Sequence, residues 1–168
     1  TLPITTFAKA LLPDGDQIEA FNRPGQLPRL VIRYDAESCY EALASEVTSL
    51  RADYGTVAIL TKNLEQAHEV YQKLHHQTSD VTLMTDADLS LPKGTLIMPI
   101  YLAKGLEFDA VIAWDVSATN FPNERFTGTL YTIATRAMHQ LVLMSLGPVS
   151  PLIASNKMPK SVLQIEHE

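Results

Sequence analysis

Hydrophobic and polar positions along the chain follow two patterns that alternate. Short continuous apolar runs are typical of strands buried on both faces of a sheet, and apolar residues that recur every three or four positions mark one face of a helix. The runs predict strands at 30–34, 56–61, 81–84, 94–101, 110–116 and 141–146. The stripes predict helices at 4–11, 36–53, 64–74 and 129–139, and the segment 17–29 predicts a short strand with a loop.

Two of the predicted helices carry capping signals. Asp35 stands before a stripe of apolar residues, and its carboxylate is expected to accept from the first free backbone N–H groups. Asn63 with Gln66 three positions later resembles a capping box. The stripe that follows Asp35 is expected to be buried and consists of Cys39, Leu43, Val47 and Leu50.

Strands that alternate with helices predict an α/β fold, a three-layer sandwich around a mainly parallel sheet. On such sheets ligands bind outside the carboxyl ends of the strands. The first places to expect a site are therefore the segments after Thr61, Tyr101, Val116 and Leu146.

Composition narrows the class of protein. The chain has 168 residues, 46% of them apolar and 19% charged, which fits one globular domain over 1–168. Its formal net charge of −6 disfavours general attraction to nucleic acid, so any phosphate binding must be local. A single cysteine fits a reducing cytoplasm, and no apolar stretch approaches the ~20 residues that span a bilayer, so no membrane partner is expected.

The two ends of the chain have different characters. The chain begins without Met and inside a helical pattern, which we interpret as a piece of a longer protein. Residues 150–168 contain Pro151 and Pro159 and show little periodicity, so we expect a peripheral tail.

Several kinds of site find little support. The chain has neither the Gly-x-x-x-x-Gly-Lys-[Ser/Thr] loop nor the Gly-x-Gly-x-x-Gly loop that cradle phosphates. His68 and His75 share a helix face, but no third or fourth ligand accompanies them, so no metal site is expected. Cys39 is best interpreted as a buried structural thiol, and Asp86 with Asp88 as part of a hydrated loop.

Two stretches remain. KGLEF, Lys104–Phe108, places two opposite charges around a glycine directly before a predicted core strand. LYTIATRAMHQLVL, Leu130–Leu143, places Arg136 on a predicted helix whose apolar face would include Ala137 and Met138. From the residues alone, a surface arginine with an aliphatic stem lying on apolar groups explains Arg136 most simply.

The same stretches resemble a known family. KGLEFDAVI resembles motif V of the UvrD/Rep-type superfamily 1 helicases, and LYTIATRAMHQLVL resembles their motif VI. TVAILTKN, Thr56–Asn63, is similar to a strand-to-helix segment of the same domain. The resemblance implies the second motor domain, 2A, with a RecA-like (P-loop NTPase-like) fold that lacks its own Walker A loop. Thr1–Ile4 matches the continuation of the family motif that ends in Tyr-Arg-Ser, whose nucleotide-binding residues would then precede Thr1.

The resemblance also implies roles for single residues. Arg136 corresponds to the motif VI arginine that reaches the γ-phosphate of ATP, and Glu107 to the carboxylate near the ribose. Gly105 would let the backbone turn, while Lys104 would contact phosphate or pair with Glu107. Tyr101, Lys104 and Thr135 are the expected motif V or nucleic-acid contacts. ATP with Mg²⁺ would be shared with the first motor domain of the same parent chain, which would hold the metal ligands.

One departure points to a branch of the family. Where motif V begins Thr-x-His, this chain has Pro99, Ile100 and Tyr101, so the phosphate-binding hydroxyl and one backbone N–H are missing. This pattern, with FNRPGQLPRLV at 21–31, resembles the HelD-like ATPases that act on RNA polymerase.

Three interpretations therefore stand before the structure. The leading one is half of an ATP-driven motor acting on DNA, inactive as the isolated chain. The second is an ATP-regulated module that docks on RNA polymerase without true unwinding. The third is an unrelated α/β binding domain.

Overall fold

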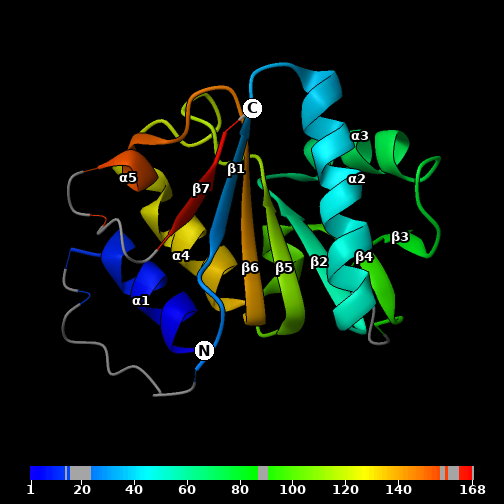
Figure 1. The fold of residues 1–168 in the computed structure, drawn as a ribbon, viewed down its shortest axis with the longest axis horizontal. Coiled ribbons are helices and arrows are strands. Elements are labelled where there is room, and N and C mark those ends of the chain that lie inside the picture. Colours follow the sequence, from blue (N-terminus) through cyan, green and yellow to red (C-terminus); the bar gives the residue numbers. More distant parts are fainter. Residues whose placement is uncertain (14, 16–23, 87–90, 156–157, 159–162, 168) are drawn as a thin grey trace.

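A seven-stranded sheet forms the centre of the molecule, in a computed structural model that describes residues 1–13, 15, 24–86, 91–155, 158 and 163–167. The order of the strands is β3-β4-β2-β5-β6-β1-β7, and each neighbouring pair is parallel (Figure 1). The strands are β1 Arg29–Arg33, β2 Thr56–Thr61, β3 Val81–Leu83, β4 Gly94–Pro99, β5 Phe108–Trp114, β6 Ala137–Leu146 and β7 Gln164–Glu166. The predicted α/β class with a mainly parallel sheet is confirmed.

Helices cover both faces of this sheet. On one face lie α2 (Ala36–Asp53) and α3 (Leu64–Leu74), and on the other lie α1 (Leu2–Leu11), α4 (Thr127–Thr135) and the short α5 (Pro151–Ala154) (Figure 1). Two 3-10 turns lie in the connections: η2 (Ile100–Ala103) between β4 and β5, and η3 (Glu124–Phe126) directly before α4. The result is the predicted three-layer sandwich.

Alternation along the central strands supplies both cores. In β2, Ala58 and Leu60 pack with α1 and α4, whereas Val57 and Ile59 pack with α2 and α3. All four side chains are fully buried. Burying a large aliphatic side chain contributes about 1.5–3 kcal/mol, so continuous apolar runs of this kind fix the strands at the centre of the sheet.

The predicted helix caps are present. Asp35 accepts from the N–H of Ser38 at 2.8 Å, and Asn63 accepts from the N–H of Gln66 at 2.9 Å. The Gln66 amide oxygen accepts from the N–H of Lys62, at 3.3 Å, one residue earlier than a standard capping box. The stripe from Cys39 to Leu50 is buried, as expected.

Two predicted boundaries near the motif residues are wrong. The strand from Gly94 ends at Pro99, and Tyr101 lies in η2. The predicted helix 129–139 is α4, which ends at Thr135, and β6 starts at Ala137. Ala137 and Met138 favour a helix locally, but pairing with β5 places this segment in the sheet. Met138 is consequently exposed and does not contribute to an apolar helix face.

The remaining differences concern segments at the rim. β5 begins at Phe108, two residues before the predicted strand. Of the strand and loop predicted over 17–29, residues 17–23 lie outside the described part, and 24–28 form no strand. The expected tail forms α5 and the edge strand β7, with Ile153 and Leu163 buried.

Candidate functional site

The two motif segments meet at the amino edge of the sheet. Phe108, the first residue of β5, donates its backbone N–H to the carbonyl oxygen of Arg136 at 2.9 Å. Phe108 also pairs with Ala137, the first residue of β6. Because β5 and β6 are parallel, Glu107 and Arg136 lie at the edge where both strands begin. Both residues directly precede a strand, as their positions in the sequence indicated, and neither lies outside the carboxyl ends, where ligands of parallel sheets usually bind.

The path of the chain explains this placement. β4 ends at Pro99 beside Thr61, at the carboxyl edge, and η2 with residues 104–107 then carries the chain back to the start of β5. Gly105 adopts a φ of +79°, a conformation that side chains with a Cβ disfavour. No heavy atom lies within 4 Å of where its Cβ would stand, so backbone conformation and not space requires glycine.

Arg136 occupies the junction between α4 and β6. It is the C-terminal cap of α4, and its side chain is half-buried. One terminal nitrogen donates to the Thr135 hydroxyl at 3.4 Å, and that hydroxyl donates to the carbonyl of Thr132 at 3.0 Å. Its Nε is buried and has no hydrogen-bond partner within the described residues. In the described part of the chain the terminal nitrogens form only the one long bond to Thr135, so the guanidinium keeps donors for an anionic ligand.

The other motif V residues are exposed. Tyr101 is 59% exposed, and Lys104, Gly105 and Glu107 all face solvent. Both ion pairs found in the described ranges, Arg29–Glu46 and Arg33–Glu166, lie elsewhere. The pairing of Lys104 with Glu107 that the sequence left open is thus not formed.

A polar network at the opposite, carboxyl edge was missed by the sequence analysis. Lys62 donates from Nζ to the carbonyl of Asn120 at 2.7 Å and lies 4.1 Å from the ring centroid of Phe126. Gln66 donates to the side-chain oxygen of Asn120 at 2.7 Å. These contacts anchor the loop between β5 and α4 to β2 and α3. The only sequence signal was a lysine directly after a buried strand.

A largely buried carboxylate joins the same edge. Asp115 follows β5 and accepts from the N–H groups of Ser117 and Leu146 and from the Ser117 hydroxyl, at 2.9–3.0 Å. Burial raises the pKa of Asp115 above its usual value, although these hydrogen bonds act in the opposite direction. Its contacts all go to the chain itself, so its role is structural.

The residues that the sequence analysis set aside behave as follows. Cys39 is buried, and His75 caps the end of α3. Within the described part of the chain no three His, Cys, Asp or Glu side chains are grouped to hold a metal ion, and no helix is long and apolar enough to cross a membrane. Asp88 lies outside the described residues.

Comparison with known proteins places this geometry in a family. The family model for the UvrD-like helicase C-terminal domain matches residues 95–144, which include both motif segments. A crystal structure of the C-terminal domain of a possible DNA helicase from Lactobacillus plantarum WCFS1 is 32% identical, with a TM-score of 0.86. The alignment covers 98% of this chain and 96% of that one. The chain belongs to the UvrD-like helicase C-terminal domains.

More distant structures share only the fold with this UvrD-like domain. The E. coli DEAD-box protein SrmB, solved bound to RraA, has a TM-score of 0.50 at 13% identity, over 74% of this chain and 79% of that one. The Arterivirus helicase nonstructural protein 10, solved with DNA, has a TM-score of 0.53 at 12% identity, over 97% of this chain and 37% of that one. No curated protein sequence matches the chain.

Proposed function

We propose that this UvrD-like domain is the second motor domain (2A) of an ATP-dependent superfamily 1 helicase or translocase. In this proposal it supplies Arg136 and Glu107 to a nucleotide site that the first motor domain of the same parent chain completes. The observation that carries the proposal is the hydrogen bond from Phe108 to Arg136, which holds both motif segments at one edge of the sheet. That edge is then one wall of an ATP cleft.

Arg136 fits a phosphate ligand. Among the described residues its terminal nitrogens form only the 3.4 Å bond to Thr135, and no carboxylate lies within ion-pair distance of the guanidinium. A guanidinium stays charged and donates in a fork that matches phosphate oxygens. Bound ATP would supply the γ-phosphoryl group, and Arg136 would stabilise the charge that develops on it during transfer.

The exposed motif V residues have complementary tasks. Glu107 would accept hydrogen bonds from the ribose hydroxyls, and Gly105 supplies the turn that precedes it. Lys104, free of any pair with Glu107, would contact phosphate. We assign the Mg²⁺ ligands to the first motor domain, since the described residues offer no cluster of oxygen ligands.

Thr135 and Tyr101 have different surroundings. Thr135 bonds to the carbonyl of Thr132 and to the Arg136 guanidinium, which favours a role in positioning the arginine over contact with nucleic acid. Tyr101 is largely exposed in η2 and remains our candidate for contact with DNA. A planar ring suits stacking on a base.

A second candidate function rests on Pro99. This residue replaces the threonine of the usual motif V, and the domain carries a net charge of −6, so both features weaken binding to a nucleic-acid backbone. They support a HelD-like parent, whose motor surface docks on RNA polymerase and is regulated by ATP.

ATP hydrolysis by the full-length parent tests the proposal. Glu107→Gln and Arg136→Ala should each lower turnover, with the arginine change the more severe. Arg125→Ala is a matched control, because Arg125 is an exposed arginine of η3 at the opposite end of α4. If all three variants hydrolysed ATP as fast as the unaltered protein, the assignment of Arg136 and Glu107 to the nucleotide site would be contradicted.

A further inference from the structure

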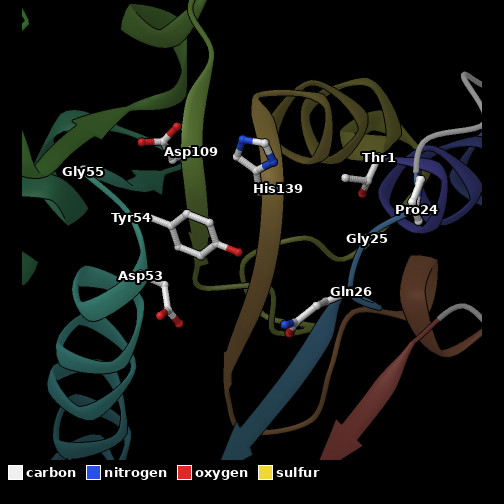
Figure 2. A pocket seen from close by; sticks show the side chains of 9 residues that line it. All are labelled: Thr1, Pro24, Gly25, Gln26, Asp53, Tyr54, Gly55, Asp109 and His139. Atoms are coloured by element: carbon white, nitrogen blue, oxygen red, sulfur yellow. The ribbon is translucent and has the colours of Figure 1, made fainter.

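A pocket of about 400 Å³ opens at the amino edge of the sheet, on the side of α2 (Figure 2). The end of α2 and the starts of β5 and β6 form its walls, with the segment 24–26 opposite. Its size lies within the range of ligand-binding pockets. None of Gly105, Glu107 and Arg136 lines it, so it is separate from the proposed nucleotide contacts.

Two stacked rings form a flat wall of this pocket. Tyr54 and His139 lie with ring centroids 5.9 Å apart and planes only 5° from parallel. Tyr54 is fixed as the cap of α2 by its N–H, which donates to the carbonyl of Leu50 at 2.8 Å. The face of the Tyr54 ring attracts cations, and the His139 ring extends the flat surface beside it.

Two carboxylates stand beside the ring wall. Asp53 occupies the last turn of α2, where a negative charge opposes the helix dipole. Among the described residues it forms no hydrogen bond or ion pair, and its side chain is exposed at the pocket. The carboxylate of Asp53 therefore does not stabilise α2.

Asp109 is oriented by the neighbouring strand. Its Oδ2 accepts from the N–H and the hydroxyl of Thr56, at 3.2 and 3.1 Å. Both bonds go to one oxygen, which leaves Oδ1 for a ligand. No lysine or arginine side chain of the described residues lines the pocket.

We propose that this pocket receives the guanidinium of an arginine side chain presented by a partner polypeptide. A planar cation can lie against the Tyr54–His139 wall and donate in fixed directions to Asp53 and Asp109, and the rounder ammonium of lysine uses such a site less well. Phosphates and nucleic acid are repelled by the same carboxylates. The pocket opens at the edge that carries Arg136, so the partner's identity as the neighbouring motor domain rests on the proposed function, whereas guanidinium binding does not.

The test is a chemical-shift titration of the 168-residue chain. The probe is N-acetyl-arginine amide, with the citrulline analogue as its neutral isostere. Arginine amide should shift the backbone amides of Asp53, Gly55 and His139 saturably, with a dissociation constant of about 1–10 mM. Citrulline amide should leave them unchanged over the same range.

Two variants separate the pocket from general attraction to an acidic protein. Asp53→Asn should weaken arginine binding about 5-fold or more, because it removes the exposed carboxylate of the pocket. Glu41→Gln removes an equal charge from an exposed position of the same helix and should have no effect. Equal shifts from arginine and citrulline, or equal weakening by both variants, would overturn the proposal. The comparison of the two probes on the unaltered chain decides the matter even if a variant misfolds.

Discussion

The N–H of Phe108 donates to the carbonyl oxygen of Arg136, across a gap of 28 positions in the sequence, and holds the starts of β5 and β6 together. It is a main-chain bond, so it fixes the backbone of both motif segments whatever their side chains do. The separation of Glu107 and Arg136 is thus set by the sheet. Substitutions in the site are therefore expected to change binding and catalysis more than they change the fold.

Gly105 should resist replacement because of its backbone. Gly105→Ala should lower the free energy of unfolding by about 1 kcal/mol, because φ of +79° is unfavourable for alanine. Urea denaturation measures this loss. Gly128→Ala, an exposed helical position of α4 with open space around it, should instead raise stability by up to about 1 kcal/mol. A Gly105→Ala chain as stable as the unaltered one would contradict the positive-φ explanation.

The fold could be predicted from sequence where a single local signal sufficed. The strand at Thr56–Thr61 and the helix cap at Asp35 were both confirmed. A strand buried on two faces requires a continuous apolar run, and a cap requires a side-chain acceptor before the helix, so both can be recognised from neighbouring residues alone. Residues 137–139 were assigned to a helix because their strand state depends on pairing with β5. Only the fold supplies that partner.

The features of the candidate site likewise fall into those that the sequence indicated and those that depend on the tertiary structure. Arg136 and Glu107 were proposed through motif resemblance, but the hydrogen bond that joins their segments was not predicted, because the path through η2 to the start of β5 is a tertiary feature. The hydrogen bond from Lys62 to Asn120 joins segments 58 positions apart, and no spacing rule indicates it. The stack of Tyr54 on His139 likewise depends on the sheet bringing two distant residues together.

Lys62 should contribute to stability through its contacts with the loop that leads into α4. Lys62→Ala removes the bond to Asn120 and the cation–π contact with Phe126, which together should cost about 1–2 kcal/mol. Lys73→Ala, at an exposed position in the last turn of α3, should cost much less. The two denaturation curves measure the difference, and equal midpoints would show that the network contributes nothing.

Asp115 should impose a pH dependence on stability. Burial raises its pKa, so the protonated form is favoured in the folded state. Its contribution is therefore fully present below the unfolded value of about 3.9 and is lost as pH rises through the raised folded pKa. Relative to Asp115→Asn, the unaltered chain should gain stability as pH falls from 7 towards 4.

The comparison of Asp115 variants is made by denaturation at several pH values. Asp115→Asn keeps an acceptor for the N–H groups of Ser117 and Leu146, so it should fold normally at pH 7. Asp115→Ala leaves those donors without a partner and should cost about 2–3 kcal/mol. If the difference in stability between the unaltered chain and Asp115→Asn did not change with pH, the raised pKa of Asp115 would be contradicted.

The isolated chain should be a poor enzyme and a poor ligand for nucleic acid. It lacks a Walker A loop, and its net charge is −6, so we expect no ATP turnover and weak binding of single strands. Fluorescence anisotropy at physiological salt measures the binding. A sub-micromolar dissociation constant, or turnover that depends on Arg136, would contradict this prediction.

The most direct test of the central claim is the effect of Arg136 on catalysis and on binding in the full-length parent. Arg136→Ala and Arg136→Lys should both lower kcat, by ~10³-fold for alanine, while the affinity for ATP falls much less. A thermal melt of each variant checks that the fold is intact, as expected for a half-buried side chain at the end of α4. The account predicts folded variants that bind ATP and hydrolyse it slowly. A folded Arg136→Ala protein with normal turnover would contradict it.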